Sequence, residues 1–129
     1  MTGVSHFLIP LVAAIGNLLL GVFVLLRGPR LELNRAFAFT TVTVVFWNLN
    51  IFSFYAFTDV QTAFFWSRFF RVGTLLMPAA VLHFFIVFSE YQSRVLRIAL
   101  YLAYAISVCL VIANADDRLV NQGSQRAAD

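Results

Sequence analysis

The chain has 129 residues, of which 61% are hydrophobic and only 12% are charged. Soluble domains carry about 25% charged residues, so this composition excludes a water-soluble fold with a charged surface. The net charge of +3 includes nine basic residues, all of them arginines. These arginines are scattered at the ends of apolar runs instead of forming one basic patch, which argues against nucleic-acid binding. We therefore expect an integral membrane protein whose main partner is the lipid bilayer.

Four apolar runs are long enough to cross a membrane as helices, which takes about 20 residues. They cover residues 6–26, 36–57, 65–88 and 95–113. The first run ends at Gly28 and Pro29, which break helices. It is longer than the apolar core of a signal peptide and no basic residue precedes it, so we expect it to be retained. The predicted organisation is a four-helix membrane unit over residues 1–115, with a polar outer loop or tail over 116–129.

The fold class follows from how continuous the apolar runs are. The segments 18–26 and 81–88 are apolar at nearly every position, whereas strands of a membrane barrel alternate apolar and polar residues. The sequence therefore predicts an all-α, polytopic membrane helix bundle with about four transmembrane helices.

The arginines also predict an orientation. Five of them lie in the segments after the first and third spans, and these segments should face the cytoplasm. Four arginines fall on the other side, so the prediction depends mainly on the first span, which no basic residue precedes. We expect the N-terminus outside and a multi-pass protein of the plasma (inner) membrane.

Polar side chains within the second span suggest a functional face. Thr40, Thr43, Trp47, Asn50 and Phe54 follow spacings of three and four, so they share one side of a helix. These polar groups can hold helices together by hydrogen bonds, or they can line a ligand or signal pocket. Trp47 and Asn50 are our candidates for such a pocket.

The third span contains a proline and a histidine. Pro78 lacks a backbone N–H and should kink the helix near Thr74, which makes it a candidate hinge. His83 is an ionisable group within the membrane, and it either forms a hydrogen bond with a Thr or Asn of a neighbouring helix or senses a proton or ligand. It is the third pocket candidate. Glu90 should lie on the same face as His83.

The fourth span has small residues at intervals of four, namely Ala99, Ala103 and Ser107. Small residues let membrane helices approach closely, so we expect this face to associate with further sensor helices or with a second copy of the chain. Cys109 is the only cysteine, which excludes an internal disulfide, and we expect it to be a small buried residue. We found no spacing typical of a metal site, a phosphate loop or a nucleophile with its base, so we expect no metal, no cofactor and no catalytic residue in this chain.

The order of landmarks along the chain resembles a known family. The landmarks are Asn17, the run from Phe23 to Arg30, the run from Asn34 to Ala38, Trp47, the run from Phe65 to Arg68, Gly73, Leu75, Leu76, Pro78, His83 and Phe84. This series is similar to the N-terminal seven-helix membrane region of bacterial histidine kinases, a sensor module also found before diguanylate cyclases. The resemblance implies an extracellular or membrane-embedded input, an N-terminus outside and a cytoplasmic output domain.

Only the first four helices of that region would be present. We therefore expect a non-enzymatic input region for signal transduction, truncated from a longer histidine kinase-like or cyclase-like protein. The alternative is a degenerate relative that acts through partners. Two rival functions are a small four-helix transporter or channel subunit and a structural membrane assembly subunit. A transporter would require several charged groups near the middle of the membrane, and only His83 qualifies.

Overall fold

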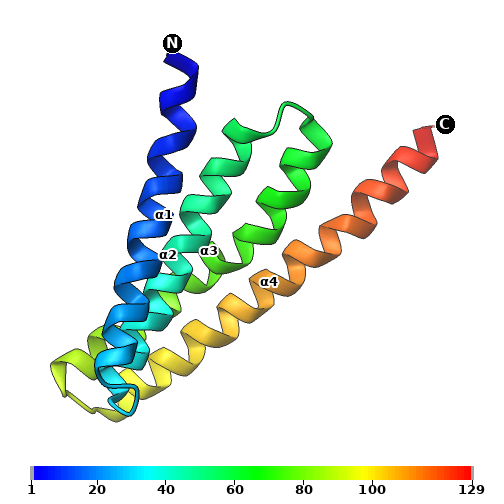
Figure 1. Ribbon diagram of the computed structural model, residues 1–129. Coiled ribbons are helices and arrows are strands. Elements are labelled where there is room, and N and C mark those ends of the chain that lie inside the picture. Colours follow the sequence, from blue (N-terminus) through cyan, green and yellow to red (C-terminus); the bar gives the residue numbers. More distant parts are fainter. Residues whose placement is uncertain (1, 129) are drawn as a thin grey trace.

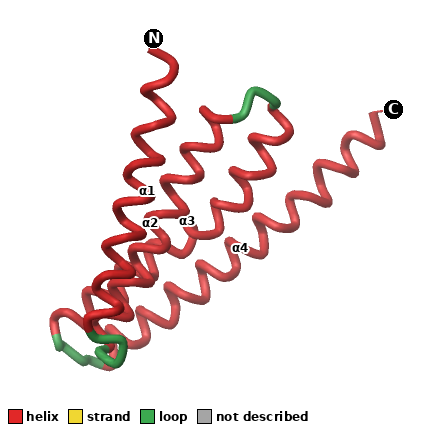
Figure 2. The backbone as a smooth tube through the Cα atoms, viewed as in Figure 1, coloured by secondary structure: helices red, strands yellow, loops and turns green. Residues whose placement is uncertain are grey.

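The computed structural model describes the backbone of residues 2–128 and the side chains of residues 6–116. The described backbone forms four helices: α1 (Thr2–Arg27), α2 (Glu32–Ala56), α3 (Val60–Ser89) and α4 (Arg94–Ala128). Successive helices run in opposite directions and are joined by short connections (Figures 1 and 2). The α1–α2 and α3–α4 connections lie at one end, and the two termini lie at the other.

Each helix contains a segment that is long and apolar enough to cross a membrane. These segments are His6–Arg27, Glu32–Ala56, Val60–Ser89 and Arg94–Asp116, with mean hydropathies of 2.5, 1.4, 2.0 and 2.3. The prediction of an all-α protein with four membrane-spanning helices is therefore confirmed.

Local sequence explains where the helices begin and end. The backbone N–H of Leu31 donates to the carbonyl of Gly28 at 3.1 Å, which closes the turn between α1 and α2. Asp59 caps the start of α3, because its carboxylate accepts from the backbone N–H of Thr62 at 2.9 Å. Glu90 ends α3 in a left-handed conformation, with a φ of 55°.

The four helices do not share one central core. α2 packs against α1 on one side and α3 on the other, whereas the backbone of α4 lies close to α3 alone. One ring contact, between Phe39 of α2 and Tyr104 of α4, also joins α4 to α2. The α3–α4 interface is also the least extensive of the three. The last helix is therefore the one held most weakly by its neighbours.

Small residues fill the helix interfaces, while the large apolar side chains face outward. The buried residues include Ala14, Ala36, Ala63, Ala79, Ala80, Thr41, Thr43, Ser53, Ser67 and Ser107. In contrast, Leu19 and Phe23 on α1 and Ile106 on α4 are exposed. This arrangement is typical of helices packed in lipid, where close approach of backbones replaces a hydrophobic core.

Two glycines make this close approach possible. A Cβ added at Gly73 of α3 would lie 2.6 Å from Cγ of Phe46 on α2, and one added at Gly21 of α1 would lie 3.2 Å from Cβ of Thr41. Gly16 of α1 has no such neighbour within 4 Å. Both neighbours of α2 therefore approach it at a position where a side chain would not fit.

Two expectations need correction at α4. The segment 116–128, predicted as a loop or tail, continues α4 as a helix. Its alanines, leucine, arginines and glutamines favour helix, and extending an existing helix is far easier than starting one. Cys109, predicted to be buried, is exposed, because α4 has a neighbour on one side only.

Candidate functional site

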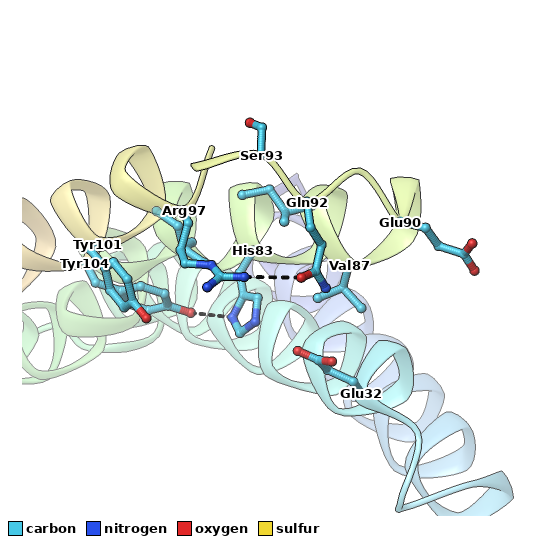
Figure 3. A pocket seen from close by; sticks show the side chains of 11 residues that line it. Glu32, His83, Val87, Glu90, Gln92, Ser93, Arg97, Tyr101 and Tyr104 are labelled. Carbon is cyan, nitrogen blue, oxygen red and sulfur yellow. Dashed lines mark hydrogen bonds between the residues drawn. The ribbon is translucent and has the colours of Figure 1, made fainter. Parts of the chain in front are cut away.

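A cleft lies between α3 and α4, beside the first turn of α2, near the end that holds the α1–α2 and α3–α4 connections. Its volume is about 590 Å³, which is within the range of small-molecule sites. It is lined by Glu32, His83, Ile86, Val87, Glu90, Gln92, Ser93, Arg97, Leu100, Tyr101 and Tyr104 (Figure 3). The lining thus combines an apolar wall with several polar groups.

A hydrogen bond between two aromatic side chains joins α3 to α4 within this cleft. Nδ1 of His83 lies 2.9 Å from the hydroxyl oxygen of Tyr104. The two rings meet edge to face, with their centroids 5.9 Å apart. Either group can donate in this bond, depending on the tautomer of the histidine. His83 thus connects two helices inside the membrane span, as one of the two interpretations of its sequence position predicted, but its partner is a tyrosine and not the expected Thr or Asn.

Charged groups lie around this pair. The guanidinium of Arg97 on α4 donates to Oε1 of Gln92 at 3.3 Å. Glu32 is contributed by the first turn of α2, and in Figure 3 its carboxylate and the Arg97 guanidinium lie on either side of His83. The carboxylate of Glu90 points away from the cleft in the same view. The site can therefore present one anionic and one cationic group to a bound molecule.

The three predicted pocket residues are not brought together. His83 lines the cleft, but Trp47 and Asn50 do not. Trp47 is 45% exposed on the outside of the bundle. Asn50 accepts a hydrogen bond from the Ser67 hydroxyl at 2.6 Å and so joins α2 to α3.

The polar face predicted for α2 acts mainly between helices. The hydroxyl of Thr40 lies 3.1 Å from the carbonyl of Ala80 on α3. Asn48 and Ser53 do not belong to the predicted polar face, yet both side chains are buried, because α2 has a neighbour on both sides.

Pro78, the hinge candidate, is exposed on α3, which continues through it as one helix. The hydroxyl of Thr74, one turn earlier, is buried and has no hydrogen-bond partner among the described residues. The hinge role of Pro78 stays a prediction.

The small residues of α4 lie toward α3 to different degrees. Ser107 is buried, and Ala99 and Ala103 are half-buried. At the far end of the same interface, the side-chain amide of Asn114 donates to the carbonyl of Arg68 at 3.3 Å.

Sequence reasoning missed most of the cleft. Arg97, Tyr101 and Tyr104 follow spacings of four and three, so the fourth span carries a polar and aromatic face that periodicity could have revealed. Glu32 had no such signal, because it reaches the cleft only through the packing of α2 beside α3. Within residues 6–116, no group of three or more His, Cys, Asp or Glu side chains could hold a metal ion.

Comparison with known proteins identifies the family. The model of the N-terminal 7TM region of histidine kinase matches residues 9–127. No curated protein and no solved structure matches the chain significantly. The family match covers all four helices, in agreement with the order of landmarks in the sequence, and the chain therefore belongs to the family of N-terminal seven-transmembrane regions of histidine kinases.

Proposed function

We propose that this chain is the first part of a membrane-embedded sensor region that passes a signal to a cytoplasmic output domain, either a histidine kinase or a diguanylate cyclase. It would be a multi-pass protein of the plasma membrane with its N-terminus outside. The observation that carries this proposal is the family match over residues 9–127, together with four membrane-spanning helices where the family has seven. In this role the chain is the input, and the enzymatic chemistry belongs to the output domain.

The proposed mechanism is a shift between two arrangements of α3 and α4. This interface is the least extensive in the bundle. It has one polar contact near each end, His83 with Tyr104 and Asn114 with Arg68. A ligand or membrane state that binds one arrangement better than the other would change their populations.

Sequencing the DNA downstream of the codon for Asp129 in the source genome tests the proposal directly. An open frame encoding three further apolar spans and a kinase or cyclase domain would support it. A stop codon directly after Asp129 would contradict the role as part of a larger sensor, and the transporter and assembly functions would then have to be tested instead.

A topology reporter tests the orientation separately. The reporter is fused after Ala115, at the end of the fourth span, and a second one is inserted in the α1–α2 connection. We expect the first on the outside and the second in the cytoplasm, because the arginine-rich connections should stay in the cytoplasm. The reverse result would contradict the proposed N-out orientation.

A further inference from the structure

The cleft holds two opposite charges that do not meet. Within the described part of the chain, the Glu32 carboxylate forms no ion pair with Arg97 or with any other cation. Among residues 6–116, the only hydrogen bond of the Arg97 guanidinium is the long one, at 3.3 Å, to the neutral amide of Gln92. Two unpaired, opposite charges facing one cavity are suited to a ligand that carries both charges itself.

The cleft also provides a surface for an apolar chain. Ile86 and Val87 on α3 and Leu100 on α4 contribute an apolar wall beside the charged groups. Tyr101 is exposed at this site, and its ring can contact an ammonium group. The cleft is partly open. Its lining includes Glu90, Gln92 and Ser93 of the α3–α4 connection, which lies at the end of the membrane spans (Figure 1), where lipid headgroups are found.

From these observations we infer that the cleft binds a zwitterion of the phosphoethanolamine type, supplied by the headgroup of an amino-phospholipid. The Glu32 carboxylate accepts hydrogen bonds from the primary ammonium, and the Arg97 guanidinium donates to the phosphate. Ile86, Val87 and Leu100 contact the first part of an acyl chain. This inference goes beyond the proposed sensor role and does not depend on whether the lipid is the signal.

The headgroup chemistry gives an order of preference. Phosphatidylethanolamine has three N–H donors for the carboxylate, whereas the trimethylammonium group of phosphatidylcholine has none. Phosphatidylglycerol has no cation at all and should bind least. Equal affinities for these three lipids, when their acyl chains are identical, would overturn the inference.

The test uses the 129-residue chain in detergent micelles, with native mass spectrometry to measure the apparent Kd of the three lipids with identical acyl chains. We expect Arg97→Gln and Glu32→Gln each to weaken phosphatidylethanolamine binding by about tenfold, the loss of one charge-assisted hydrogen bond. Arg97→Lys should retain most of the affinity, because it keeps the cation.

Arg94→Gln is the matched control, since Arg94 is exposed on the first turn of α4 but does not line the cleft. It removes the same charge at the same end of the same helix and should leave the affinity within about twofold. An equal loss in Arg94→Gln and Arg97→Gln would overturn the inference, because binding would then depend only on net charge. Circular dichroism of every variant establishes that the helices are retained.

Soluble phosphoethanolamine distinguishes the two sources of the same zwitterion. If millimolar phosphoethanolamine leaves the bound phospholipid in place, the acyl chain contributes to binding and the lipid is the ligand. If phosphoethanolamine displaces the phospholipid when the two are present at the same concentration, the assignment to lipid is overturned in favour of a soluble ligand. Neither result changes the sensor proposal, which the downstream reading frame tests on its own.

Discussion

The hydroxyl of Ser67 on α3 donates a 2.6 Å hydrogen bond to Oδ1 of Asn50 on α2. Ser67 is completely buried, so this bond lies inside the most extensive interface of the bundle. Asn50 was a candidate for a signal pocket, but in the structure its side-chain oxygen joins two helices. The bond also fixes how α2 and α3 are aligned, because both partners are short and cannot follow a sliding helix.

Replacing Asn50 by Ala should therefore destabilise the bundle. The Ser67 hydroxyl would lose its acceptor, and bonds of this kind between membrane helices contribute about 0.6 kcal/mol on average and up to about 1.7 kcal/mol. The free energy of unfolding can be measured in bicelles by steric trapping. Asn17→Ala is the control, since the Asn17 amide, within the described side chains, bonds only to the carbonyl of Ala13 in its own helix. Equal losses in both variants would show that the bond between helices contributes nothing specific.

Gly73→Ala should be more damaging than its small size suggests. The new methyl group would lie 2.6 Å from Cγ of Phe46, and relieving such overpacking costs about 1–3 kcal/mol. Gly16→Ala has open space around it, so it should be neutral or stabilising by up to about 1 kcal/mol through helix propensity. The same unfolding measurement checks both variants. A stabilising effect of Gly73→Ala would contradict the close approach of α2 and α3.

The bond between His83 and Tyr104 can be isolated by a double-mutant cycle. His83→Phe and Tyr104→Phe keep both rings and remove the polar groups, so we expect a coupling free energy of about 0.6 kcal/mol. His6 and Tyr55 form a matched control pair, because their rings stack with centroids 6.3 Å apart and no hydrogen bond joins them among the described contacts. That pair should show a coupling near zero. Equal couplings would mean that the hydrogen bond between His83 and Tyr104 contributes nothing beyond the contact of their rings.

The start of α3 should become less stable in acid. The Thr62 hydroxyl and backbone N–H both bond to the Asp59 carboxylate and hold the pKa of this group below its usual value of 3.8. The cap is therefore fully formed above pH 3.8 and is lost as the pH falls through the lower pKa of the folded state. The protection factor of the Thr62 amide, which compares its hydrogen-exchange rate with the intrinsic rate at the same pH, should fall over that range. Asp59→Asn, which can still cap a helix, should remove this pH dependence; an unchanged dependence would assign it to another group.

The four spans could be predicted from the sequence because each one depends only on the length and continuity of an apolar run. The end of the first helix could also be predicted, because it depends on the helix-breaking residues Gly28 and Pro29, and α1 ends beside them. The helix over 116–128 could not be recognised from its polar composition, which is also typical of a loop, although Arg118, Gln122, Gln125 and Arg126 favour a helix that has already formed.

The site was harder to predict because it depends on which faces of the helices meet. Periodicity placed Trp47 and Asn50 on one side of α2, but it could not show that α2 has two neighbours and that Trp47 lies outside both interfaces. His83 was recognisable because an ionisable group in a membrane span is unusual. Its partner Tyr104 is 21 residues away, and only the packing of α3 against α4 brings the two together.

The small side chains between the helices have a consequence for how this protein tolerates substitution. In a soluble domain, exposed positions accept almost any residue and buried ones require large apolar side chains. Here Leu19 or Phe23 should accept exchange for any other apolar residue, whereas Ala79, Ala80 and Ser67, which have no exposed surface, should reject every larger side chain. A comprehensive substitution scan of this chain would therefore find its most restricted positions among its smallest residues.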